Sequence, residues 1–85
     1  TGNFVTDDPY ADIEKCAPYA VNVQIKVEIR RKGQKSSEPA DFKRLIEILK
    51  KSNYQGFVAL EYEAAEDPLT AVPRYLKELG KLCSV

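Results

Sequence analysis

Glu61 is the residue whose position most favours chemistry, because it stands near the end of a short apolar strand, just before a new helix begins. The strand is predicted over residues 57–62, and Asp67-Pro68 marks the start of the helix. Ligands of parallel α/β sheets bind at the carboxyl ends of the strands. A carboxylate there can hold a cation or transfer a proton. The alternatives are a surface carboxylate and a partner for Lys26 on the neighbouring strand.

A second strand, predicted over residues 21–29, supplies the other candidate side chains. Apolar and polar residues alternate strictly along it, which is typical of a strand with two different faces. The polar set is Asn22, Gln24, Lys26, Glu28 and Arg30, and the apolar set is Val21, Val23, Ile25, Val27 and Ile29. A solvated face of an antiparallel sheet would also explain the polar set.

Three helices are predicted around these strands. The first covers residues 9–17, begins at Asp8-Pro9 and ends before Pro18. The second is amphipathic, covers residues 41–52 and is capped near Asp41. The third covers residues 68–82, where Pro73 should kink the helix or mark its regular start.

The order helix, strand, helix, strand, helix predicts a βαβ crossover that makes the two strands parallel neighbours. A parallel sheet is normally covered on both faces, but few apolar residues remain to cover the polar side of residues 21–29. The predicted unit is therefore an incomplete parallel sheet with one uncovered face.

Composition excludes several classes of protein. The 85 residues carry 13 basic and 13 acidic side chains, so no net charge favours nucleic acid. No apolar run is long enough for a membrane helix, and no signal peptide is evident, so we expect one soluble, cytoplasmic unit. Cys16 and Cys83 form no CxxC pair and are expected to be reduced packing residues, with a disulfide or a redox role as alternatives.

A basic segment and a second glutamate lie near the same strand ends. The basic segment contains Arg30, Arg31, Lys32 and Lys35, and it could receive a phosphate. No Gly-rich cradle accompanies it, so a solvated loop is the favoured interpretation. Glu63 shares the parity of Glu61 but falls where the loop should already begin. Asp8 and Asp67 are interpreted as helix caps rather than as ligands.

Several ordered motifs carry a family resemblance that spans essentially the whole chain. They are Thr1-Gly-Asn-Phe, Asp8-Pro-Tyr, Ala17-Pro-Tyr-Ala-Val-Asn-Val-Gln-Ile-Lys26, Asn53-Tyr-Gln-Gly-Phe-Val-Ala-Leu-Glu-Tyr-Glu63 and Glu66-Asp-Pro-Leu-Thr-Ala-Val-Pro-Arg-Tyr-Leu-Lys-Glu-Leu79. The chain resembles the C-terminal part of a sugar phosphate isomerase/epimerase of the xylose isomerase-like TIM barrel family. The resemblance implies the C-terminal three βα units of a (β/α)8 TIM barrel, with parallel strands and outer helices.

The resemblance also implies a divalent metal, such as magnesium, manganese or zinc, at the carboxyl-end mouth of the complete barrel. The family commonly holds it with two glutamates, an aspartate and a histidine, and Glu61 matches the glutamate of the last strand. The position of the histidine is occupied by Gln24, whose carbonyl oxygen suits a hard cation better than a softer metal. The aspartate would lie just before Thr1, so the metal is expected in the complete barrel, and this chain by itself holds only part of the ligand set.

The implied mechanism is an aldose–ketose isomerisation or an epimerisation through an enediolate. Glu61 would bind the metal and carry a proton, and Lys26 would stabilise the developing negative charge. In a curled sheet, Asn22, Gln24 and Arg30 would face a small sugar or sugar phosphate.

A full barrel takes about 250 residues, so we expect the 85-residue chain to be catalytically inactive alone. Its exposed sheet edges favour self-association, or docking to the missing N-terminal part of the barrel. The substitution by Gln24 supports an alternative, a non-catalytic sugar-binding or structural barrel module.

Overall fold

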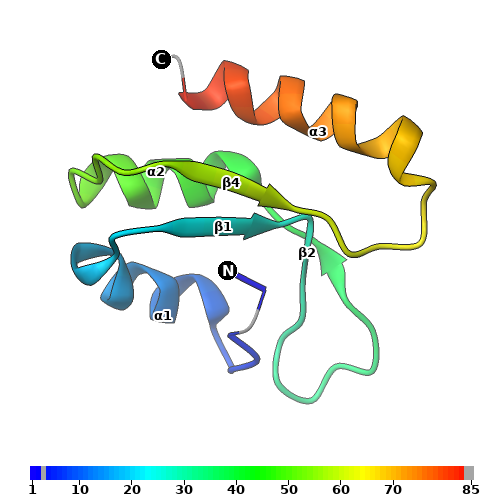
Figure 1. Cartoon of the computed structure of the whole chain (residues 1–85). Helices are drawn as coiled ribbons and strands as arrows, with labels where there is room; N and C mark the ends of the chain where they lie inside the picture. The colour runs from blue at the N-terminus through cyan, green and yellow to red at the C-terminus, as the bar shows by residue number, and fades with distance from the viewer. Residues whose placement is uncertain (3, 84–85) are drawn as a thin grey trace.

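A parallel strand pair, a short antiparallel hairpin and three α-helices make up the chain in a computed structural model that describes residues 1–2 and 4–83. The elements follow one another around the parallel pair (Figure 1). In chain order they are α1 (Pro9–Cys16), a 3₁₀ turn (Ala17–Tyr19), β1 (Val23–Lys26), β2 (Glu28–Ile29), β3 (Glu38–Pro39), α2 (Phe42–Lys51), β4 (Val58–Glu61) and α3 (Pro68–Cys83).

The parallel pairing of the two main strands confirms the predicted crossover. β1 and β4 pair in a register that runs from Val23 opposite Val58 to Lys26 opposite Glu61. The chain between them passes through the hairpin and α2, so the carboxyl ends of both strands lie at the same end of the sheet (Figure 1). The candidate residues Lys26 and Glu61 lie side by side at this end.

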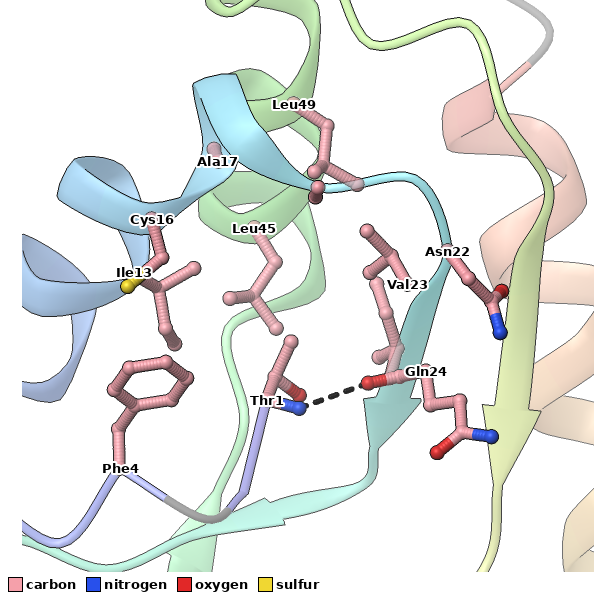
Figure 2. A pocket seen from close by; sticks show the side chains of 12 residues that line it. Thr1, Phe4, Ile13, Cys16, Ala17, Asn22, Val23, Gln24, Leu45 and Leu49 are labelled. Carbon is pink, nitrogen blue, oxygen red and sulfur yellow. Dashed lines mark hydrogen bonds between the residues drawn. The ribbon is translucent and has the colours of Figure 1, made fainter.

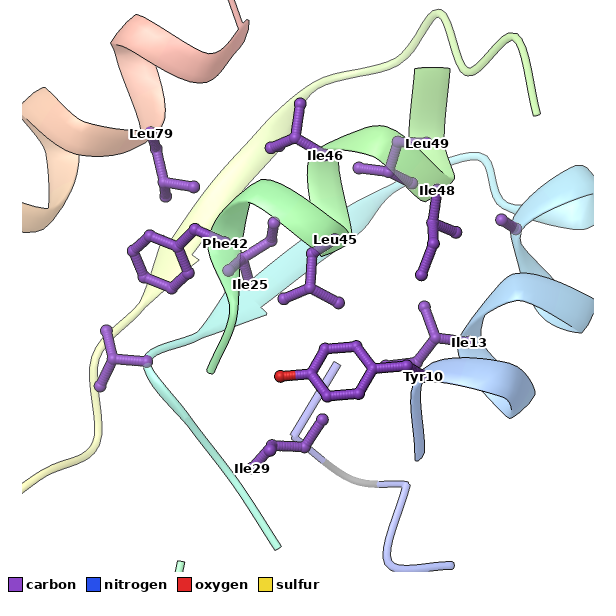
Figure 3. Close-up of a cluster of buried hydrophobic side chains, with 12 residues drawn as sticks. Tyr10, Ile13, Ile25, Ile29, Phe42, Leu45, Ile46, Ile48, Leu49 and Leu79 are labelled. Atoms are coloured by element: carbon purple, nitrogen blue, oxygen red, sulfur yellow. The ribbon is translucent and has the colours of Figure 1, made fainter. Parts of the chain in front are cut away.

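Helix α2 supplies more of the buried core residues than any other element, as its apolar periodicity predicts. Its N-cap is Asp41, whose side chain accepts a hydrogen bond from the Arg44 amide. The helix packs one face against the strands, where Ile25 is completely buried, and against α1 (Figure 3). All five apolar residues of its stripe are buried: Phe42, Leu45, Ile46, Ile48 and Leu49.

The strand predicted over residues 21–29 is wrong in its extent. Val21 is 92% exposed and precedes β1, and a bend at Val27 separates β1 from β2. The Val27 carbonyl accepts a hydrogen bond from the Ala40 amide, and β2 pairs antiparallel with β3. No strand was expected between residues 31 and 39, where β3 lies. The alternation of apolar and polar residues continues through the bend, although the chain changes direction there.

The first helix begins and ends close to its predicted limits. Asp8 accepts a hydrogen bond from the Ala11 amide, and the α-helical part ends at Cys16 before Pro18 enters the 3₁₀ turn. The buried Tyr10 ring links α1 to α2, because its hydroxyl oxygen accepts a hydrogen bond from the Asp41 amide.

Helix α3 runs through Pro73 without interruption, and its apolar stripe is only partly buried. Ala71 and Leu79 are buried, whereas Leu69 is 87% exposed and Leu76 is 53% exposed. The last helix thus presents an uncovered apolar face.

The two cysteines, Cys16 and Cys83, are free and exposed, so the expected packing role is not observed.

The fold is a small α/β arrangement, and the described residues close no barrel. The parallel pair and its outer helices are present, but the sheet has two open edges. Asn3, which belongs to the Thr1-Gly-Asn-Phe motif, lies outside the described residues. No helix in the described ranges has the length and apolar character needed to cross a membrane.

Candidate functional site

The carboxyl ends of β1 and β4 bring together five residues, which we call the carboxyl-end cluster: Thr1, Gln24, Lys26, Glu61 and Glu63. Lys26 and Glu61 are register partners and the last residues of their strands. Side chains of register partners in a parallel pair point to the same face of the sheet. The structure therefore places these two residues side by side at the strand ends, which is also the arrangement expected if Glu61 serves only as a partner for Lys26.

Lys26 is held in place from several directions. Its ammonium lies 3.4 Å from a carboxylate oxygen of Glu63, and its backbone amide donates to the Thr1 hydroxyl at 3.1 Å. Gly2 packs against its aliphatic stem, because a Cβ built at Gly2 would lie 2.6 Å from Lys26 Cδ. The Lys26 side chain is only 19% exposed, against 66% for Glu63. Its ammonium is therefore positioned rather than freely mobile.

Thr1 contributes a second positive group to the cluster. Its ammonium donates to the Gln24 carbonyl at 2.8 Å (Figure 2). Burial lowers the pKa of this ammonium, the positive charge of Lys26 lowers it further, and the Glu61 carboxylate raises it. The two cations and Glu61 are thus close enough for their charges to interact.

Gln24 and Asn22 occupy the polar face of the sheet, as the alternation predicts. Figure 2 shows their side chains pointing away from the apolar cluster that includes Leu45 and Leu49. Gln24 lies opposite the small Ala59, one step before the Lys26–Glu61 pair. Gln24 and Glu61 are therefore diagonal neighbours on one face, with no bulky side chain between them.

Arg30 is not brought to this cluster. It follows β2, after the bend at Val27, and no hydrogen bond or ion pair among the described residues joins it to Glu61 or Lys26. Its neighbour Arg31 instead pairs with Glu38 at 3.0 Å, which stabilises the hairpin. Within the basic segment, Arg31 therefore stabilises the hairpin rather than contributing to the carboxyl-end cluster.

A clamp on the loop after β4 was not predicted from the sequence. Arg74 makes two hydrogen bonds to Glu66, at 2.9 and 2.8 Å, and the Tyr62 hydroxyl donates to the Glu66 carbonyl at 2.7 Å. The hydrogen bonds from Arg74 hold the pKa of Glu66 below its usual value. Glu66 lies in the loop before α3, so the spacing of ion pairs within a helix does not predict this clamp.

The donor set at the cluster suits a hard cation only in part. Glu61 offers carboxylate oxygens and Gln24 an amide oxygen, which are the ligand types that magnesium prefers. Within residues 1–2 and 4–83, no three His, Cys, Asp or Glu side chains gather as a metal site. The described residues would therefore supply a minority of the six ligands that magnesium takes.

Comparisons with models of known protein families, with curated proteins and with solved structures give no significant match.

Proposed function

We propose that this chain is the C-terminal part of a metal-dependent sugar or sugar phosphate isomerase/epimerase built on a xylose isomerase-like TIM barrel. The observation that supports the proposal most strongly is the parallel register that places Lys26 and Glu61 side by side at the carboxyl ends of β1 and β4. Active sites of TIM barrels lie at this end of the strands. A cytoplasmic location is part of the same proposal.

The two faces of the parallel pair support a barrel rather than a flat sheet. Ile25 is completely buried against the helices, whereas Gln24 and Ala59 are exposed on the opposite face. In a barrel, one face of each strand packs against the outer helices and the other lines the interior. The polar face is then the interior wall, and it requires strands that these residues do not supply.

The residues of the cluster have separate roles in the proposed reaction. Glu61 accepts a proton from the carbon next to the sugar carbonyl and, in an isomerisation, returns it to the neighbouring carbon. In an epimerisation, a second carboxylate from the remaining barrel would protonate the opposite face of the enediolate. The Lys26 ammonium donates a hydrogen bond to the oxygen on which negative charge develops in the enediolate. A divalent metal, when bound by Glu61 and Gln24 together with residues of the remaining barrel, would polarise the carbonyl.

The chain alone is expected to be inactive, because it offers too few metal ligands and because the mouth of the barrel is incomplete without the other strands. Its partner would be the N-terminal part of the barrel or further copies of itself. Exposed apolar residues on the outer surface favour such a partner, since Phe57 and Leu69 are both nearly 90% exposed, at 89% and 87%.

The coding sequence upstream of Thr1 tests this proposal. It should encode an aspartate directly before Thr1 and a glutamate that ends the preceding strand. The protein encoded by the longer frame should interconvert a ketose phosphate and its isomer or epimer. Glu61→Gln should abolish turnover, whereas Glu47→Gln on the exposed side of α2 should preserve it. A reading frame that starts at Thr1 would contradict the proposal that the protein is an enzyme.

A non-catalytic sugar-binding module is the second candidate, and Gln24 favours it. An amide at this position can donate and accept hydrogen bonds with sugar hydroxyls, and no histidine is present for acid or base catalysis near neutral pH. Sugar binding by the longer protein that is unchanged by a chelator, without turnover, would support the module. Binding or turnover lost with the chelator would support the isomerase.

A further inference from the structure

The loop between β4 and α3, residues 62–67, is closed on itself around Glu63. Tyr62 precedes Glu63, and its hydroxyl donates to the Glu66 carbonyl at 2.7 Å. The Glu66 carboxylate in turn accepts two hydrogen bonds from Arg74 of α3, at 2.9 and 2.8 Å. Residues 63–65 therefore form a short arch between two residues that are hydrogen-bonded to each other, in the loop that leads from β4 to α3 (Figure 1).

Aromatic contacts anchor this loop to α3 and α2. The Tyr62 ring centre lies 6.1 Å from that of Tyr75 in α3, and the Tyr75 ring meets the buried Phe42 of α2 edge to face at 5.6 Å. The Arg74 guanidinium lies 4.8 Å from the centre of the Tyr75 ring. The path of the loop, and with it the position of the carboxylate that the loop carries, is therefore set by contacts outside the carboxyl-end cluster.

The Glu63 carboxylate lies on the solvent side of the Lys26 ammonium. The two groups are 3.4 Å apart, and the Lys26 side chain is 19% exposed, against 66% for Glu63. The carboxylate therefore occupies the side from which a dissolved ligand approaches the ammonium. A ligand group that bonds to this ammonium must share it with Glu63 or displace Glu63.

The chemistry of the pair indicates which ligand groups compete with Glu63. A lysine ammonium forms its strongest hydrogen bonds with ionised oxygens, such as those of carboxylate and phosphate. An exposed ion pair stabilises a folded protein only weakly, so a ligand oxyanion can replace the carboxylate at little cost to the fold. A neutral hydroxyl gains less from the ammonium, and it competes poorly with a carboxylate that the fold already holds in place.

We propose that Lys26 forms an oxyanion subsite and that Glu63 is an internal competitor for it. The Glu63 carboxylate occupies the place of a phosphate or carboxylate group of a small ligand, which binds by displacing it. Tyr62 is a positioning residue, because its hydrogen bond to the Glu66 carbonyl holds the competing carboxylate over Lys26. The inference rests on the proposed function only in taking Lys26 as a group that contacts the ligand. It requires no metal and no proton transfer by Glu61, so binding of an oxyanion and turnover of a sugar can fail independently.

Titration of the 85-residue chain with inorganic phosphate tests the subsite, at an ionic strength held constant with chloride. The backbone amide resonances of Lys26 and Glu61 are followed by NMR. Glu63→Gln keeps the size of the side chain and removes its charge, so it should lower the Kd for phosphate about fivefold or more, as the loss of one competing charge predicts. Glu78→Gln, on an exposed position of α3, removes the same charge elsewhere and should leave the Kd unchanged.

Lys26→Met in the Glu63→Gln protein should abolish saturable binding of phosphate. Four results would overturn the subsite: an unchanged Kd in Glu63→Gln, no saturable binding by that variant, an equal fall of the Kd in Glu78→Gln, or saturable binding that survives Lys26→Met.

Tyr62→Phe separates a positioning role from a merely structural one. The variant keeps the ring against Tyr75 but loses the hydrogen bond to Glu66, so the Glu63 carboxylate should leave Lys26 more often. Phosphate affinity should rise, by less than in Glu63→Gln, and the NOE between the Lys26 ε-methylene and the Glu63 γ-methylene should weaken. In the Glu63→Gln background, Tyr62→Phe should not change the Kd further, because residue 63 then carries no carboxylate to position. An equal effect of Tyr62→Phe with and without that carboxylate would overturn the positioning role.

Discussion

Lys26 is the register partner of Glu61, but its ammonium forms an ion pair with Glu63, two residues further along the chain. The chain leaves β4 after Glu61 and carries Glu63 over the end of β1. Exposed ion pairs of this kind contribute about 1 kcal/mol or less to folding. The pair therefore orients the Lys26 ammonium over the strand ends more than it stabilises the fold.

The Thr1 ammonium should report on both charges of the carboxyl-end cluster. Lys26→Met removes a neighbouring positive charge and should raise the pKa of Thr1, whereas Glu61→Gln removes a negative charge and should lower it. Lys43→Met, on an exposed position of α2, should leave it unchanged. A pH titration of the Thr1 resonances by NMR measures each pKa. Shifts in the same direction for both cluster variants would show that the three groups do not lie together.

The clamp between Glu66 and Arg74 should make stability depend on pH in the acidic range. The folded-state pKa of Glu66 lies below its unfolded value, so its contribution is fully present above the unfolded pKa of about 4.3. It is lost as the pH falls through the folded-state value. Thermal unfolding of the wild type and of Glu66→Gln should therefore differ most near neutral pH and converge in acid. Arg74→Lys, which loses the paired hydrogen bonds, should resemble Glu66→Gln. A difference that grows as the pH falls would contradict the assignment.

Two glycines should respond oppositely to alanine. A Cβ at Gly2 would lie 3.0 Å from the Glu28 carbonyl oxygen as well as against Lys26, so Gly2→Ala should destabilise the fold by about 1 kcal/mol. Gly80 lies in α3 with open space around the same position, so Gly80→Ala should stabilise it by about 0.5–1 kcal/mol. Urea unfolding measures both values. Stabilisation by Gly2→Ala would place the first two residues away from β1.

The cap of α2 should contribute measurably to stability, because this helix supplies the largest share of the core. Asp41→Ala removes the acceptor for the Arg44 amide and should lower the free energy of unfolding by about 1 kcal/mol. Asp41→Asn keeps an acceptor of the same length and should cost much less. Urea unfolding distinguishes the two. Equal losses would indicate that the charge of Asp41, rather than its hydrogen bond, matters.

The sequence predicts those features that depend on neighbouring residues along the chain. The stripe and cap of α2 are local patterns, and the apolar strand that ends at Glu61 follows from composition and from the next helix start. The bend at Val27 is not local, because it depends on the hydrogen bond from Ala40. The alternation of residues 21–30 persists through that bend and conceals it.

The candidate site likewise contains residues whose positions the sequence predicts and residues whose positions it does not. Strand ends and parity place Lys26, Glu61 and Gln24 together, since both follow from the period of a strand. The approach of Glu63 to Lys26, the packing of Gly2 and the clamp at Glu66 depend on the path of loops, which leaves no periodic signal. The burial of only part of the α3 stripe, with Leu69 and Leu76 exposed, depends on which elements α3 packs against and not on helical spacing alone.

Binding of Mn²⁺ followed by NMR tests most directly whether the carboxyl-end cluster holds a cation. The paramagnetic ion broadens the resonances of nearby amides even when it binds weakly, so an incomplete site remains detectable. We predict selective broadening at Gln24, Lys26 and Glu61, which Glu61→Gln abolishes and Glu47→Gln preserves. Broadening that is centred on other carboxylates, or that survives in Glu61→Gln, would contradict a metal site at the ends of β1 and β4.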